Sequence, residues 1–151
     1  MHNQGIAQSI FPDSEGLETF LKEQGGYGLH ENLLKYGLMT KLFLYVDYKG
    51  EQYQKIVNFM LDYEFTNQIE LATQEELEKL EAFNYDYLPE KIELANKILS
   101  PKGYGLFSYP NSGDFFALFI AKIEDIIKFL QEEVLFDDRI PFQERCIKYY
   151  K

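Results

Sequence analysis

The chain is predicted to fold as an α+β domain, in which a small mixed β-sheet with a central hairpin is flanked by helices. Three observations lead to this prediction. Several segments carry apolar residues at the spacing of an amphipathic helix. Two other segments are apolar without alternation, which is typical of strands covered on both faces. Finally, two strand-like runs between residues 104 and 121 are joined by the short polar loop PNSGD, which indicates a hairpin.

The first half of the chain is predicted to begin with two short helices. One follows Pro12, with Asp13 or Ser14 as its cap, and the other spans residues 30–36. The apolar run KLFLYVD, at residues 41–47, then predicts a buried strand, because it combines aromatic and branched residues without alternation.

Three helices are expected between this strand and the hairpin. The first runs from Glu51 to about Tyr63 and has one apolar face. Thr73 and Glu76 have the spacing of a capping box, which predicts that the second helix begins there. Pro89 suits the first position of the third helix, since its missing N–H has no partner there.

A further helix with apolar residues from Ile123 to Val134 follows the hairpin. The tail leaves two alternatives open: a short helix that starts at Pro141, or an edge strand at CIKYY, residues 146–150. The strand is favoured slightly. A long crossover separates residues 47 and 104, so the first strand could pair in parallel, which is why a mixed sheet is expected.

The loop PNSGD has two interpretations. Asn111 and Gly113 tolerate turn conformations and Asp114 can bond nearby amides, which favours a plain hairpin turn. The alternative is a ligand-binding loop. Phosphate-binding loops, however, lead from a strand into a helix, and here the loop leads into a strand.

Composition bounds the class of protein. A chain of 151 residues with 46% hydrophobic and 17% aromatic residues is expected to form one globular domain over residues 1–151. No window approaches 18 consecutive apolar residues, and the first residues do not resemble a secretory signal, so no membrane association is expected. The single cysteine, Cys146, favours a reducing cytoplasm.

Charge is unevenly distributed along the chain. The net charge is −10, which argues against nucleic acid as a partner because phosphate binding needs a basic surface. The segment from Asp62 to Glu93 holds ten acidic residues against two lysines, and so carries −8 of that charge. It is either a solvated surface or a binding face for a basic protein. The candidate binding residues are Glu75, Glu76, Glu78, Tyr85, Asp86 and Tyr87.

Signals for catalysis are weak. The only histidines, His2 and His30, and the one cysteine have no metal-ligand spacing, so no zinc site and no cofactor are expected. An enzyme would have to use carboxylates: Asp47 ends a buried strand, Glu51 follows it, and Asp114 begins the last apolar strand. If these three converged, they could hold a metal ion or perform acid–base catalysis. Otherwise they are turn and helix-start residues.

One part of the sequence is similar to a known group of proteins. The segment from Leu88 to Val134, with LPEKIELANKIL followed by GYGLFSYPNSGDFFALFIAK, resembles a bacterial family of domains of unknown function. The matching residues are Asp114, Phe116, Leu118 and Phe119. The resemblance implies a helix followed by a hairpin and implies no activity. In size and acidity the chain is also similar to bacterial immunity proteins, which neutralise basic toxins.

The function predicted from the sequence is therefore a non-catalytic protein-interaction module of the bacterial cytoplasm, with an acidic face for a basic protein partner. The alternative is a small hydrolase or metal-dependent enzyme that uses Asp47, Glu51 and Asp114.

Overall fold

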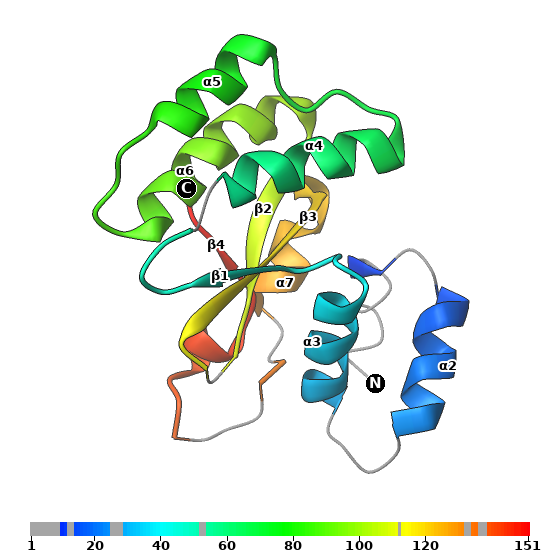
Figure 1. Ribbon diagram of the computed structural model, residues 1–151. Coiled ribbons are helices and arrows are strands. Elements are labelled where there is room, and N and C mark those ends of the chain that lie inside the picture. The colour runs from blue at the N-terminus through cyan, green and yellow to red at the C-terminus, as the bar shows by residue number, and fades with distance from the viewer. Residues whose placement is uncertain are drawn as a thin grey trace.

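Four strands form one sheet in the computed structural model, which describes residues 10–11, 14–24, 29–51, 54–111, 113–131, 134–135 and 139–151 (Figure 1). The strands lie in the order β1-β3-β2-β4, and each neighbouring pair is antiparallel. Their bounds are β1, Leu44–Asp47; β2, Tyr104–Tyr109; β3, Phe115–Lys122; and β4, Lys148–Tyr149. The α+β fold is confirmed.

The sheet is antiparallel among the described strands, whereas a mixed sheet was expected. The long crossover does bring β1 and β2 into the sheet in the same direction, but they are not neighbours. β3 returns from the hairpin and inserts between them, so it runs against both. β3 pairs with β2 across the short hairpin turn and with β1 along its other edge, so it separates the two strands that the crossover connects.

Three helices cover one face of the sheet, as Figure 1 shows above the strands. They are α4, Lys55–Asn67; α5, Gln74–Ala82; and α6, Leu88–Leu99. α6 packs on β2 and α4 on β1, while α5 packs on both helices. The buried side chains between these elements include Val46, Met60, Leu80 and Ile92. Because α5 lies mainly on other helices, its outer side faces solvent.

The opposite face packs against helices from both ends of the chain: α2, Ser14–Gln24; α3, Leu29–Met39; and α7, Ile126–Gln131. Aromatic rings fill this layer. Phe107, Phe119 and Phe129 have ring centroids 5.0 to 5.7 Å apart. α7 is shorter than expected because residues Ile123–Asp125 form a 3-10 turn before it. The cap candidate Asp13 lies outside the described residues.

Successive residues of β3 explain why the run has no polar alternation. Phe116, Leu118 and Ile120 belong to the core beneath α4, α5 and α6, while Ala117 and Phe119 belong to the aromatic core on the other face. A strand with a core on both faces needs apolar residues at every position. The prediction that helices cover both faces is confirmed.

The C-terminal tail contains both of the expected alternatives. A 3-10 helix covers Phe142–Arg145, directly after Pro141, and β4 then pairs with the edge of β2. The N–H groups of Val134 and Leu135 both donate to the carbonyl of Arg145, at 2.9 and 3.1 Å. The tail is thereby attached to residues 134–135, which follow α7 in the chain, as well as to the sheet.

Candidate functional site

The acidic segment places many of its carboxylates on the outside of the helical layer. Leu77 and Leu80 are the buried residues of α5, and Glu75, Glu78 and Glu81 are exposed. We call these three glutamates the acidic face. Lys79, the cation of this helix, pairs with Glu75 at 3.6 Å in an exposed i,i+4 contact. Asp62, Glu70 and Asp86 are also exposed in the same segment of the chain.

Three other carboxylates of the segment have structural roles. Glu76 forms the predicted capping box, in which its Oε1 accepts from the N–H of Thr73 at 2.9 Å. Glu90 Oε1 accepts from the N–H groups of Asp86 and Tyr87, both at 2.9 Å. Glu64 likewise accepts hydrogen bonds from two backbone N–H groups in the loop before α5. Each of these carboxylates satisfies backbone N–H groups that have no partner within a helix. Glu76 was a candidate binding residue, and its side chain is already engaged within the chain.

The loop between α5 and α6 divides the remaining candidates. Tyr87 is 74% exposed, and Asp86 beside it is also exposed. Tyr85 is partly buried, and its hydroxyl accepts a hydrogen bond from the N–H of Glu51 at 3.0 Å. Tyr85 therefore contributes to the packing of the loop, while Tyr87 and Asp86 are available at the surface.

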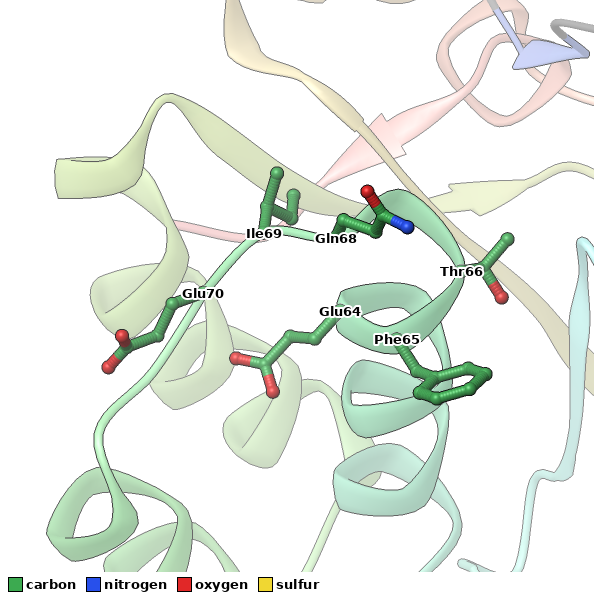
Figure 2. Close-up of a pocket in the computed structure, with 6 residues that line it drawn as sticks. All are labelled: Glu64, Phe65, Thr66, Gln68, Ile69 and Glu70. Atoms are coloured by element: carbon green, nitrogen blue, oxygen red, sulfur yellow. The ribbon is translucent and has the colours of Figure 1, made fainter.

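The end of α4 carries an apolar surface residue that the sequence analysis did not single out. Phe65 is 87% exposed, and Leu61, one turn earlier on the helix, is also exposed. In Figure 2, the Phe65 ring projects away from the helix, while the side chains of Glu64 and Glu70 extend on the other side. A hollow in the surface lies between the end of α4 and the loop that follows it. Glu64 Oε2 accepts hydrogen bonds from the N–H groups of Leu71 and Ala72 and so holds this loop against the helix. The helical spacing would have placed Phe65 opposite the buried face of α4.

The three carboxylates of the enzymatic alternative have separate tasks. Asp47 Oδ1 accepts from the N–H of Lys49 at 2.8 Å, as a turn residue does. Asp114 is exposed, and its carbonyl accepts from the N–H of Tyr48. The carboxylate of Glu51 is buried against Lys91. Among the described residues, no group of three histidine, cysteine or acidic side chains could hold a metal ion.

Lys91 is the residue that organises Glu51, and the sequence analysis missed it. Its side chain is 2% exposed, and that of Glu51 is 4% exposed. The ammonium donates to Glu51 Oε1 and to Gln54 Oε1, and lies 5.8 Å from the centre of the Tyr85 ring. Glu51 Oε2 accepts from the N–H of Ile56 at 3.0 Å. This network fixes the segment before α4 to α6.

The hairpin loop is stabilised by its own asparagine. Asn111 Oδ1 accepts from the N–H of Gly113 at 2.9 Å, and its Nδ2 donates to the carbonyl of Phe115 at 3.1 Å. This is how asparagine stabilises a tight turn. The predicted hairpin is confirmed by the pairing of β2 with β3. Ser112 lies outside the described residues.

His30 joins α3 to this hairpin. Its Nε2 donates to the carbonyl of Pro110 at 2.6 Å, and its ring stacks on Tyr109. Burial lowers the pKa of His30, with smaller opposing effects from the Pro110 carbonyl and Glu31. Its Nδ1 is buried without a hydrogen-bond partner. His30 therefore packs as a neutral ring in the core.

The observations above define the class of this protein: an acidic α+β domain with helices on both faces of an antiparallel sheet. None of the helices in the described ranges has both the length and the apolar character needed to cross a membrane. A family model described as a domain of unknown function (DUF6630) matches residues 7–134. The chain belongs to this family, and the resemblance to a family of domains of unknown function is confirmed in that form.

The family match covers more of the chain than the segment from Leu88 to Val134 that suggested it. It ends before the C-terminal tail, which supplies β4. No curated protein and no solved structure matches the chain.

Proposed function

We propose that this protein is a non-catalytic interaction module of the bacterial cytoplasm that binds a basic protein through the acidic face of α5, as an immunity protein would. The observation that carries the proposal is the exposure of Glu75, Glu78 and Glu81 along one helix that buries only leucines. Clustered charge of one sign costs stability through self-repulsion. It is useful when it accelerates association with an oppositely charged partner.

Exposed aromatic residues in the same segment of the chain support a protein partner. Phe65 ends α4, and Tyr87 precedes α6. Interfaces combine charged rims with large apolar side chains, because the apolar contacts hold a complex that the charges steer together. An acidic surface with exposed aromatic groups fits a basic protein that also carries apolar contact residues.

The enzymatic alternative has less support. It requires Asp47, Glu51 and Asp114 to act together, and the carboxylate of Glu51 is occupied by Lys91 and the N–H of Ile56. We therefore favour the interaction module.

Charge reversal on α5 tests the proposal. The variant Glu75→Lys, Glu78→Lys, Glu81→Lys removes the acidic face and spares Glu76, whose loss would break the capping box. We expect slower association with a basic protein that co-purifies with the chain, measured by surface plasmon resonance, and little change in dissociation. The wild-type rate should fall with salt, because the Debye length shrinks from about 10 Å at 0.1 M to about 3 Å at 1 M.

A matched control lies on the opposite layer. Glu15, Glu18 and Glu23 are exposed on α2, and reversing them changes the net charge by the same amount. This control should leave the association rate close to the wild-type rate. The acidic face would be only a solvated surface if both variants slowed association equally. The same would follow if neither salt nor the α5 variant changed the association rate.

A further inference from the structure

A second hollow lies where the β2–β3 hairpin meets the C-terminal tail. Its volume is about 270 Å³, and we call it the sheet-end pocket. The walls come from four separate parts of the chain: Tyr48 after β1, Ser108 in β2, Phe116 in β3, and alternate tail residues that include Glu144, Lys148 and Tyr150. Pockets for drug-sized ligands span about 300–1,000 Å³, so this one fits a smaller molecule.

Ser108 gives the pocket a buried polar group. It is 8% exposed and sits in the sheet between Leu118 of β3 and Lys148 of β4. No hydrogen bond joins its hydroxyl to another described residue. Its oxygen is not one of the buried side-chain atoms that lack a partner, so solvent reaches it inside the pocket. A ligand in the pocket would replace this solvent as its hydrogen-bond partner.

Two opposite charges stand beside this hydroxyl. Lys148 is opposite Ser108 in the strand ladder, so both side chains lie on the same face of the sheet. Lys148 Nζ is 3.9 Å from Glu144 Oε1, which is too long for a hydrogen bond. Both side chains are partly exposed and line the pocket. The pocket therefore offers a cation and an anion side by side, only loosely paired.

Aromatic side chains complete the walls. The rings of Tyr48 and Phe116 meet edge to face, with centroids 4.8 Å apart. Tyr150 lies two residues after Lys148 and so shares its face of the strand. Burial, followed by the nearby Tyr48 and Glu144, raises the pKa of Tyr150, so its hydroxyl remains a hydrogen-bond donor or acceptor at neutral pH.

We propose that the sheet-end pocket binds a free α-amino acid with an apolar or aromatic side chain. The carboxylate of the ligand pairs with Lys148 and accepts from the Ser108 hydroxyl, and its ammonium pairs with Glu144. The side chain packs on Tyr48 and Phe116. A simple anion or cation would be attracted by one charge of the pocket and repelled by the other, whereas a zwitterion satisfies both. The site is independent of the acidic face on α5.

Calorimetric titration of the full chain tests the proposal with L-phenylalanine and L-leucine as probes. Two analogues serve as controls: 3-phenylpropionate lacks the ammonium and phenethylamine lacks the carboxylate. We expect at least one of the two amino acids to bind. Both analogues derive from L-phenylalanine, and each should bind about tenfold more weakly than it, because each loses a charge-assisted hydrogen bond. Amide resonances of Ser108 and Lys148 should shift on titration. No binding up to about 10 mM, or analogues that bind as well as the amino acid, would overturn the proposal.

Three substitutions locate the ligand. Ser108→Ala, Lys148→Met and Glu144→Gln should each weaken binding, by about tenfold for the charged residues. Glu144 is partly exposed, so its variant keeps the test valid if the others reduce folding. The matched control is Glu75→Gln with Lys79→Met, which removes a comparable i,i+4 ion pair on α5. If none of the three substitutions changed the affinity for the amino acid, or if the control lowered it equally, the ligand would bind elsewhere. The proposal for the sheet-end pocket would then be refuted.

Discussion

Replacing Lys91 by methionine tests how the segment before α4 is held. The Lys91 and Glu51 side chains are 2% and 4% exposed, so removal of the ammonium would leave the Glu51 carboxylate buried without its counter-ion. Methionine retains much of the apolar stem of lysine. Breaking a buried ion pair on one side costs about 3–5 kcal/mol. Domains have free energies of unfolding of about 5–15 kcal/mol, so Lys91→Met should lose about a fifth or more of the stability.

The double variant Glu51→Gln, Lys91→Met separates the charge effect from a packing effect. Replacing both partners of a buried pair by neutral groups is often close to neutral, and glutamine keeps an acceptor for the Ile56 N–H. We expect urea unfolding to show a large loss for the single variant and recovery of most of it in the double variant, with an unchanged m-value. A single variant that loses less than about 1 kcal/mol, or a double variant as unstable as the single one, would refute this account.

Two further predictions concern the hairpin. Because burial holds the folded-state pKa of His30 below its unperturbed value of 6.5, the unfolded chain takes up a proton first as the pH falls. The free energy of unfolding should therefore decline as the pH falls from about 6.5 to the folded-state pKa. In urea titrations at several pH values, His30→Gln should flatten this decline. A decline that is unchanged in the variant would show that His30 does not cause it. Gly113→Val should destabilise because a Cβ there would lie 2.6 Å from the Phe115 ring, and adding Phe115→Leu should restore part of the loss in thermal unfolding. An equal loss with and without the Phe115 substitution would point to the backbone instead.

Local features of the fold could be predicted from the sequence. The Thr73 and Glu76 capping box involves residues three positions apart, so its spacing is visible in the chain. The hairpin was predictable for the same reason. Gly113 was expected in the turn because glycine tolerates turn conformations, but the described glycines with positive φ are Gly50 and Gly103. The constraint at Gly113 comes from a neighbouring ring, which turn statistics do not contain.

Features that depend on distant parts of the chain were not predictable. Glu51 and Lys91 are far apart in the sequence, and a lysine inside an acidic segment resembles an ordinary solvated residue until α6 packs against the loop. The expected mixed sheet is not found among the described strands, because a crossover does not show which strand will lie between its two ends. The sheet-end pocket combines Tyr48, Ser108 and the tail, and none of these segments carries a recognisable motif alone.

The short segment from Asp47 to Glu51 links the buried pair to the sheet-end pocket. At one end the N–H of Tyr48 donates to the carbonyl of Asp114 at 3.2 Å, which ties it to the hairpin. At the other end Glu51 is held by Lys91. Tyr48, at the hairpin end of this segment, forms a wall of the pocket. The Lys91–Glu51 pair thus fixes one end of the short segment that carries Tyr48 into the wall of the sheet-end pocket.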